Sequence, residues 1–201
     1  TRNTKHVTQI LRKKPHFAIV AAGNLDDMRS LPKIYQKYKI PYIYDPGQAL
    51  PALSEKDLIA GLTGAEVFIC NDYELAMTLK KTGLTKKKLL DRVEVLITTL
   101  GEKGSVIEVG KISNFQFPIS NSRIDISPAK PKNICDPTGA GDAYRAGLIK
   151  GLLLGLPIDK IGKLASVVSV YTVEKYGTQT HWFNWLMLIK RYRENFKEEL
   201  L

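Results

Sequence analysis

The segment Asp136-Pro-Thr-Gly-Ala-Gly-Asp142 combines residue types that suit phosphate chemistry. Its glycines let the backbone approach an anion, and the apolar run that follows predicts a helix whose first N–H groups lack intrahelical partners. Those donors and the helix dipole favour a phosphate group. Asp142 beside such a site could take a proton from an attacking hydroxyl. The segment therefore predicts phosphoryl transfer, with Asp142 as base and the amides of Gly139, Ala140 and Gly141 stabilising charge.

A structural alternative explains the same residues without catalysis. Thr138 could cap the helix through its hydroxyl, and Asp142 could simply favour the helix dipole. The chain contains no GxxxxGK[ST] sequence, so the predicted phosphate site is not a P-loop.

The longer run from Asp136 to Ile149, DPTGAGDAYRAGLI, resembles the C-terminal signature of the ribokinase/PfkB family of sugar and nucleoside kinases. Other segments resemble this family in the right order, from about residue 15 to the C-terminus. The resemblance implies an α/β, ribokinase-like three-layer sandwich whose mostly parallel central sheet is flanked by helices. It also implies ATP-dependent phosphorylation of a hydroxyl on a sugar or nucleoside, with ATP and Mg²⁺ as cofactors.

Two internal motifs extend the resemblance. Asn71-Asp-Tyr-Glu74 matches the family's NxxE motif, whose amide and carboxylate help arrange magnesium, water and the nucleotide phosphates. Indirect binding is reasonable because Mg²⁺ keeps several of its waters. Thr99-Leu-Gly-Glu-Lys-Gly104 resembles the TLGxxG turn beside the nucleotide. Standing alone, the two segments also fit a helix capped by Asn71 and a plain hairpin turn.

A third segment, Tyr176-Gly-Thr-Gln-Thr-His181, falls where family members place the loop over the adenine and a nearby monovalent-cation site, which implies K⁺. Some members carry an asparagine on the preceding helix, and none lies between Asn133 and Asn184 here. His181 also fits an ordinary loop histidine. The nucleotide-side candidates are Asn71, Glu74, Thr99, Gly101, Gly104 and Gly177. The metal candidates are Glu74 and Asn71 for Mg²⁺, and Asp136 and Thr138 for the monovalent cation.

Finer features bear on the substrate. Three segments together look most like bacterial adenosine-kinase-like members: Tyr44-Asp-Pro-Gly-Gln48, Asp142-Ala-Tyr-Arg-Ala-Gly147 and Gly177-Thr-Gln-Thr-His181. Arg145 lies three residues after Asp142 on one helical face, so it could bind a phosphate or pair with Asp142 or Glu74.

The elements that must position these residues alternate short apolar runs with longer amphipathic ones, which is typical of α/β units. Strands are predicted at residues 17–22, 42–45, 67–70, 93–100 and 105–109. Helices are predicted at 26–39, from 54 or 57 to an end marked by Gly61 and Gly64, at 71–81, 140–154, 158–175 and 182–196. We expect Pro32 in the first turn of its helix and the helix from Ala140 to be buried on most sides. Residues 111–132 could hold edge strands or a loop.

The composition describes an ordinary globular chain. Its 201 residues, 44% hydrophobic and 25% charged, predict one α/β domain over residues 1–201. Cys70 and Cys135 show no disulfide or zinc pattern, and both are expected to be buried thiols. Apolar runs fall short of the ~20 residues of a membrane helix and no secretory segment opens the chain, so a cytoplasmic protein is predicted.

A net charge of +10 leaves nucleic acid as a rival partner, but no zinc-finger, homeodomain or RNP pattern supports it. The chain begins at Thr1, which predicts that an N-terminal portion, including the family's substrate lid and N-terminal strands, is absent. The alternative function is therefore an inactive nucleotide-binding remnant, or a subunit lacking its lid. The acceptor and the oligomeric state, including a homodimer, stay open.

Overall fold

The computed structural model describes residues 17–110 and 123–201. Within these ranges, one compact unit contains residues 17–98 and 108–110, and a second contains residues 99–107 and 123–201. Six strands hydrogen-bond in the order β1-β2-β3-β4-β5-β6. The predicted α/β class, a mostly parallel sheet flanked by helices, is confirmed.

The strands of the first unit follow the predicted runs closely. They are β1 (Ala18–Ala21), β2 (Tyr42–Asp45), β3 (Val67–Asn71) and β4 (Val95–Thr99), at whose last residue the second unit begins. β1 pairs with β2 in parallel from Ala18↔Tyr42 to Ala21↔Asp45, and β2 pairs with β3 through Tyr44↔Phe68. All four residues of β2 are buried, as continuous apolar runs in parallel sheets usually are.

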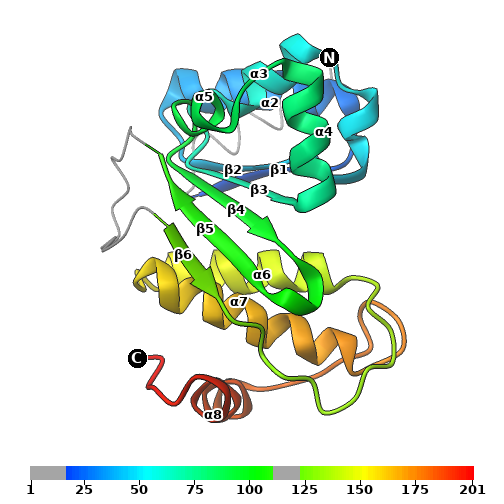
Figure 1. Cartoon of the computed structure of the whole chain (residues 1–201), viewed down its shortest axis with the longest axis vertical. Helices are drawn as coiled ribbons and strands as arrows, with labels where there is room; N and C mark the ends of the chain where they lie inside the picture. The colour runs from blue at the N-terminus through cyan, green and yellow to red at the C-terminus, as the bar shows by residue number, and fades with distance from the viewer. Residues whose placement is uncertain (1–16, 111–122) are drawn as a thin grey trace. The chain divides into compact units, whose positions relative to one another are not determined.

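The helices of this unit cover one side of β1, β2 and β3 (Figure 1). They are α2 (Leu25–Tyr38), η1 (Gly47–Ala52), α3 (Glu55–Leu62), α4 (Asp72–Thr82) and α5 (Lys86–Leu90). Asn24, Ser54 and Thr85 cap α2, α3 and α5 through their side chains, because each accepts a hydrogen bond from an N–H of the first turn. Ser54, one of the two predicted starting points, thus begins α3.

Pro32 lies in the middle of α2, and the prediction that it occupies the first turn is wrong. The helix begins earlier, because Asn24 caps it by accepting the N–H groups of Asp26 and Asp27. Met28 and Tyr35 are buried on either side of Pro32, which is buried as well. Their packing compensates for the hydrogen bond that a proline cannot donate.

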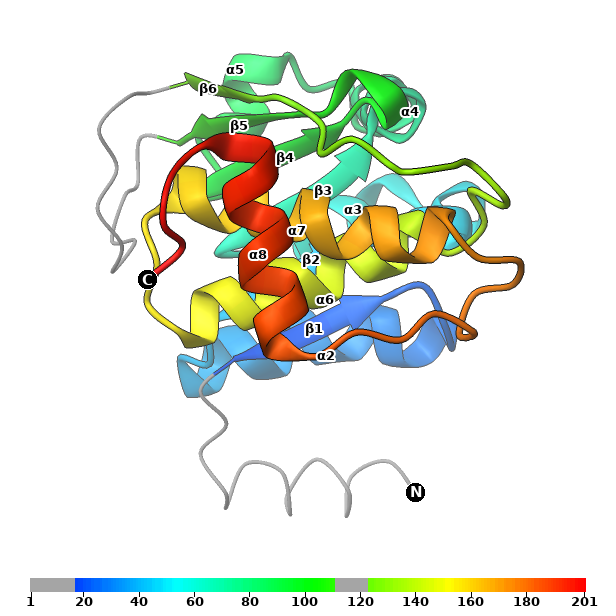
Figure 2. The same cartoon turned by 90° about the horizontal axis from the view of Figure 1, so that it is seen from below.

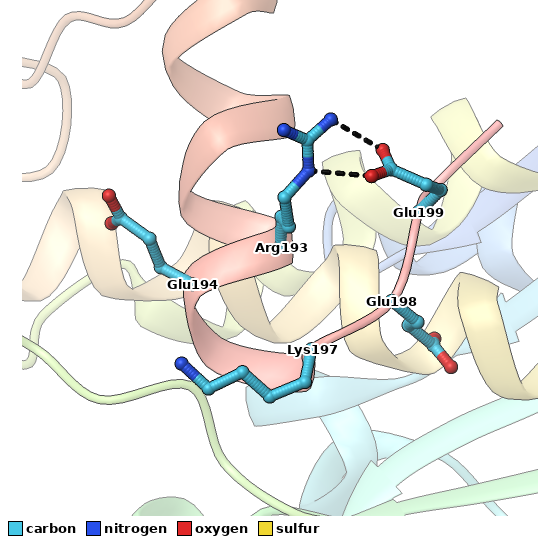
Figure 3. A pocket seen from close by; sticks show the side chains of 5 residues that line it. All are labelled: Arg193, Glu194, Lys197, Glu198 and Glu199. Carbon is cyan, nitrogen blue, oxygen red and sulfur yellow. Dashed lines mark hydrogen bonds and ion pairs between the residues drawn. The ribbon is translucent and has the colours of Figure 1, made fainter.

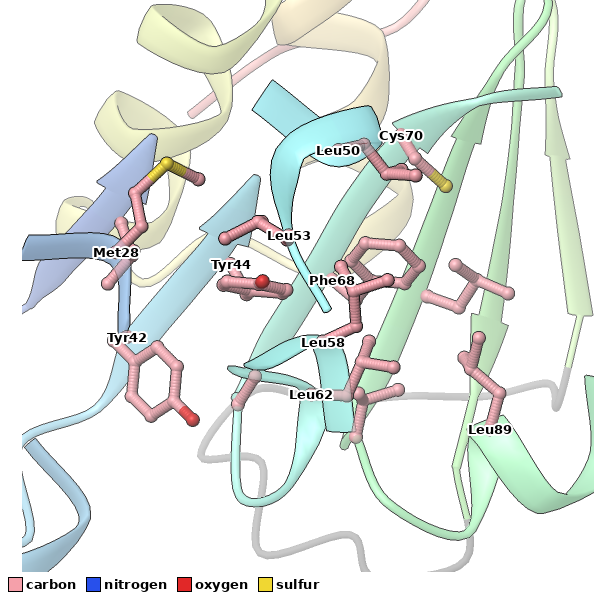
Figure 4. Packing of buried hydrophobic residues seen from close by; sticks show 14 of the residues in the cluster. Met28, Tyr42, Tyr44, Leu50, Leu53, Leu58, Leu62, Phe68, Cys70 and Leu89 are labelled. Carbon is pink, nitrogen blue, oxygen red and sulfur yellow. The ribbon is translucent and has the colours of Figure 1, made fainter. Parts of the chain in front are cut away.

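Gly61 lies in the last turn of α3, which ends at Leu62, so the helix end predicted at Gly61 and Gly64 is confirmed. The ring of Tyr44 explains why a glycine is needed, since a β-carbon at position 61 would lie 2.2 Å from the ring atom Cζ. Tyr44 is fully buried in the core of this unit, which Figure 4 shows around Phe68, Leu58 and Leu62. Tertiary packing therefore decides the residue at this position.

Glu66 and Glu94 lie side by side where β3 and β4 begin. The N–H of Val95 donates to the Glu66 carbonyl at 2.9 Å, and the N–H of Glu94 donates to the Ala65 carbonyl at 3.2 Å. Burial, and then the nearby charge of Glu94, raise the pKa of Glu66 to about 7, and burial also raises the pKa of Glu94. The folded chain therefore holds a proton on Glu66 more tightly than the unfolded chain does.

Replacing Glu66 with glutamine should remove a pH-dependent loss of stability. An unfolded glutamate titrates near about 4.3, so the wild-type chain should lose stability as the pH rises from there through about 7. We expect Glu66→Gln to have a higher urea midpoint than the wild type at pH 8 and a similar one at pH 4. Glu55→Gln, at an exposed position, serves as the control. A Glu66→Gln variant that gains nothing at pH 8 would contradict the prediction.

The second unit contains η2 (Gly101–Lys103), the first three residues of β5 (Ser105–Val109), β6 (Arg123–Ile126), α6 (Ala140–Leu153), α7 (Ile158–Val173) and α8 (Trp185–Phe196). For residues 111–132 the sequence left open whether they form edge strands or a loop. β6 is a strand in this stretch, and residues 111–122 lie outside the described residues. Figure 2 shows α6 and α7 side by side, with α8 against α7. None of the helices in the described ranges is both long and apolar enough to cross a membrane.

Helix α6 is buried along one face only, so the expectation of burial on most sides is wrong. Its buried residues are Ala143, Tyr144, Gly147, Leu148, Gly151 and Leu152. Leu153, in contrast, is 58% exposed. Gly147 allows α6 to approach α7 closely, because a β-carbon there would lie 2.6 Å from the Cα of Ala165. The helix that begins at the candidate site is thus fixed through its contact with α7.

Gly147→Ala should destabilise the chain by about 1–2 kcal/mol, because overpacking costs about 1–3 kcal/mol and the better helix propensity of alanine returns only part of it. Ala146→Ser, at the exposed neighbouring position, should stay within about 0.5 kcal/mol of the wild type. Urea unfolding measures both values. Equal stability of Gly147→Ala and the wild type would show that α6 and α7 can move apart freely.

The two cysteines differ in exposure. Cys70 is buried, as predicted, but Cys135 is exposed, so that part of the prediction is wrong. Cys135 lies outside any helix or strand, and its N–H donates to the Val173 carbonyl at 2.9 Å. Its thiol lies 2.8 Å from the Asn133 side-chain nitrogen, at an exposed position. The backbone contact, and not burial of the thiol, holds this residue.

Candidate active site

The turn from Asp136 to Asp142 leads directly into α6. The Thr138 N–H donates to Asp136 Oδ1 at 2.9 Å, and the Ala140 N–H donates to the Pro137 carbonyl at 3.1 Å. Gly139 has φ +82°, a left-handed conformation that glycine adopts without strain. A β-carbon at Gly139 would also lie 3.0 Å from Cβ and Cγ2 of Thr178. Conformation and space both require glycine here.

No side chain caps the N-terminus of α6, where Gly139 is the N-cap residue. Thr138 does not cap the helix, so that part of the structural alternative is wrong. Gly141, two residues after Gly139, is exposed. The start of a helix carries the positive end of the helix dipole. The first turn of a helix has backbone donors without intrahelical partners, and an external anion would satisfy them. The Ala140 amide already has a partner in the turn, so it would have to share or exchange that partner.

Asp142 lies in the first turn of α6 with its side chain 88% exposed. Arg145, on the same face, places Nη1 3.5 Å from Asp142 Oδ1. The predicted local ion pair is therefore formed, and a pair of this length with an exposed carboxylate is weak. The carboxylate stays accessible to a hydroxyl-bearing molecule at the helix start.

Asp136 links the turn to the segment after α7. Its Oδ2 accepts the Gly177 N–H at 3.1 Å, while Oδ1 accepts the Thr138 N–H. The hydrogen bonds from Thr138, and then that from Gly177, hold the pKa of Asp136 below its ordinary value. The structure thus brings together three predicted residues, Asp136, Thr138 and Gly177, around one carboxylate.

The segment after α7 is held by aromatic contacts. His181 places Nδ1 3.3 Å from Oγ1 of the buried Thr172 and stacks on Phe183, with ring centroids 6.1 Å apart. Phe183 in turn stacks on Tyr171 at 4.4 Å. These contacts give His181 a structural role, in line with the ordinary loop histidine that sequence allowed.

The segment from Thr99 to Gly104 closes the β4–β5 hairpin. The Leu100 N–H donates to the Gly104 carbonyl at 2.8 Å, and the Gly104 N–H donates to the Gly101 carbonyl at 3.1 Å. Gly104 has φ +89°, and a β-carbon there would lie 2.1 Å from the Ile126 carbonyl oxygen. Gly101 has φ +59° but faces open space. Packing explains Gly104, whereas the open side of Gly101 leaves room for a ligand.

Asn71 and Glu74 belong to the first unit, where they form a capping box at the start of α4. Asn71 Oδ1 accepts the Glu74 N–H at 2.7 Å, and Glu74 Oε2 accepts the Asn71 N–H at 2.9 Å. The structural alternative for this motif is therefore realised. Across residues 17–110 and 123–201, no three His, Cys, Asp or Glu side chains group closely enough to hold a metal ion.

Sequence reasoning missed two features near the turn. Thr178 packs against Gly139, and a buried pair of Glu174 and Arg191 lies beside the chain that leads into Asp136. Glu174 and Arg191 are 17 residues apart on different elements, and neither belongs to a motif. Only the unusual burial of an arginine, 5% exposed, reveals the pair.

A separate cavity of about 520 Å³ lies at the end of α8 and contains none of the motif residues. Its lining consists of Arg193, Glu194, Lys197, Glu198 and Glu199, of which Arg193 and Glu199 pair at 2.7 Å (Figure 3). Opposite charges on its walls therefore neutralise each other in part.

The fold and the turn define a class of α/β proteins with a glycine turn and an acidic residue at an uncapped helix start. The profile of the pfkB family carbohydrate kinases matches residues 18–184, and the chain belongs to this family.

Relatives and solved structures agree with this assignment. The nucleoside kinase of Methanocaldococcus jannaschii is 30% identical over 76% of this chain, and that of Methanothermobacter thermautotrophicus is 32% identical over 69%. The nucleoside kinase of Burkholderia thailandensis in complex with inosine aligns with a TM-score of 0.84 and 28% identity over 92% of this chain and 58% of that chain. The ribokinase of Arabidopsis thaliana, at 17% identity over 92% of this chain and 58% of that chain, has a TM-score of 0.73, which confirms the ribokinase-like fold. The chain spans about half the length of its sequence relatives, 47% and 41%.

Gly139→Ala should destabilise the chain more than Gly155→Ala. Both positions have positive φ, which costs alanine about 1–2 kcal/mol, but a β-carbon at Gly155 meets nothing within 4 Å, whereas one at Gly139 meets Thr178. Urea unfolding gives the difference between the two variants directly. Equal losses would mean that Thr178 moves away without cost and that the turn is not confined.

Proposed function

We propose that this chain supplies the nucleotide-binding and catalytic part of an ATP-dependent kinase that phosphorylates a hydroxyl of a nucleoside or sugar. The observation that carries the proposal is the uncapped start of α6, where the left-handed Gly139 precedes an exposed Asp142. Several relatives are named nucleoside kinases, and the Burkholderia thailandensis enzyme forms complexes with inosine and with ADP-inosine. These names favour a nucleoside over a simple sugar, and the adenosine-kinase-like motifs make adenosine the first one to test.

Each proposed role follows from the chemistry of the residues. Asp142 takes the proton from the acceptor hydroxyl, and the amides of Gly139, Ala140 and Gly141 stabilise the charge on the transferred group. When bound, ATP with Mg²⁺ supplies the phosphoryl group and neutralises part of its charge. A glycine turn and an open helix start fit the binding of such an anion.

The remaining candidates would contact the nucleotide and the ions. Thr99, Gly101, Gly104 and Gly177 would lie beside the nucleotide, and Asn71 and Glu74 would act on Mg²⁺ through water. In that role the two residues would have to cap α4 and bind the water of Mg²⁺ at the same time. The amide oxygen has two lone pairs and the carboxylate has two oxygens, so both residues can do this. Asp136 and Thr138 would hold K⁺ near Gly177. The family profile spans both compact units, which supports one kinase domain, and the cytoplasm is its proposed location.

A second candidate is a nucleotide-binding part that needs a further segment or partner to select its acceptor. The share of the relatives' length that the chain covers, 47% and 41%, favours this possibility. ADP release in the presence of adenosine, inosine, cytidine, ribose and fructose separates the two candidates. Turnover with one acceptor supports the kinase, whereas nucleotide binding without turnover on any acceptor supports the second candidate.

Asp142→Asn should lose turnover by a factor of about 10² to 10⁴, the usual contribution of a general base, because an amide cannot take the proton. Nucleotide binding should stay close to that of the wild type. Asp159→Asn, which changes an acid in the first turn of α7, is the matched control and should keep its activity. ADP release and calorimetric titration with ATP measure the two effects. Near-normal turnover of Asp142→Asn would end the assignment of the base.

A further inference from the structure

The segment from Ala129 to Cys135, here called the approach segment, leads into the candidate catalytic turn without forming a helix or strand. Side chains of other elements hold its backbone. The Ala129 N–H donates to Ser166 Oγ at 2.8 Å, and the Lys130 N–H donates to Asn195 Oδ1 at 2.7 Å. Because no ladder fixes this backbone, its course depends on such individual contacts.

Glu174 and Arg191 supply the charged contacts to the approach segment. Arg191 donates through Nη1 to Glu174 Oε2 at 2.8 Å and through Nη2 to Glu174 Oε1. The same Nη2 donates to the Lys130 carbonyl at 3.1 Å, and Glu174 Oε1 accepts the Lys132 N–H. The side chains of Arg191 and Glu174 are only 6% and 10% exposed. One buried ion pair thus connects the end of α7, helix α8 and the approach segment.

Arg191 also contacts the aromatic stack that holds the loop after α7. Its guanidinium carbon lies 4.7 Å from the centroid of the Tyr171 ring, on which Phe183 stacks. That loop carries Gly177, whose N–H donates to Asp136. The guanidinium group therefore contacts the approach segment directly and the loop after α7 through the Tyr171 ring.

The chemistry of this pair is better suited to fixing geometry than to adding stability. Taking two charges out of water is costly, and apolar side chains in the same space are often as stabilising. A planar guanidinium with five donors, in contrast, can hold a carboxylate, a carbonyl and a ring in one fixed arrangement. Arg193, two residues later, pairs with Glu199 at the surface and makes no such set of contacts in the described structure.

We propose that Arg191, held by Glu174, is a positioning residue for the phosphoryl-transfer site: it fixes the approach segment and the loop after α7, and so holds the turn that carries Asp142. This inference rests on the proposed function for its catalytic consequence. Its structural consequence, the order of the turn around Asp136, can be measured without activity.

The test compares Arg191→Met and Arg191→Lys with Arg193→Met in the full chain. The first readout is amide hydrogen exchange at Thr138 and Gly177, whose N–H groups bind Asp136, with the amides of β2 and β3 as reference. We expect Arg191→Met to speed exchange at both sites at least about tenfold, as the loss of a charge-assisted hydrogen bond would. Arg191→Lys should restore part of the protection, and Arg193→Met should change neither site.

The second readout is turnover with the acceptor found in the ADP-release screen. Misplacement of the turn should lower kcat of Arg191→Met by about 10- to 100-fold while KM changes less. Should the single variant fold poorly, Glu174→Leu/Arg191→Met removes both charges together and is expected to fold, because no unpaired charge is left buried. The double variant should show the same fast exchange at Thr138 and Gly177.

The outcomes are distinct. Unchanged exchange at Thr138 and Gly177 in folded Arg191→Met or the double variant overturns the proposal, as does an equal increase at every amide, which indicates a general stabilising role. Wild-type chain without turnover on any acceptor counts against the proposed function. In that case the exchange result still decides whether Arg191 positions the turn.

Discussion

The carboxylate of Asp136 is the contact on which the candidate site depends. One of its oxygens accepts the Thr138 N–H and shapes the turn before α6, while the other accepts the Gly177 N–H and joins the segment after α7. Two stretches far apart in sequence therefore meet at a single ionised group. The left-handed Gly139 and its contact with Thr178 follow from this meeting, because they occupy the narrow space between the same two stretches.

Around this contact the second unit uses close backbone approach and buried polar groups together. Gly147 brings α6 against Ala165 of α7, and Gly162 brings α7 against Ile107 and Ile126 of the strands. These contacts place the start of α6 at a defined point, but they leave most of the approach segment to side-chain contacts. A buried arginine is a suitable solution there, since one rigid group can serve several acceptors.

Much of the fold was predictable from sequence, because buried parallel strands and amphipathic helices have distinct periods. The errors came from tertiary contacts. Pro32 lies inside a helix that flanking buried residues stabilise, and Gly61, which does mark the end of α3, also makes room for the Tyr44 ring. Thr138 had the right residue type for a cap, yet the Asp136 turn places Gly139 at the N-cap position.

The sequence by itself determined the family, the order of most strands and helices, and the residues that can do chemistry, because these depend on residue type and spacing along the chain. The tertiary structure alone decided which backbone donors lack a side-chain cap, and that Glu174 and Arg191 form a buried pair beside the approach segment. The physical reason is that a buried pair between residues far apart in sequence depends on distances between atoms that no local pattern encodes. The segment from Asp136 to Asp142 is thus recognisable in sequence, whereas the contacts that hold it in place are not.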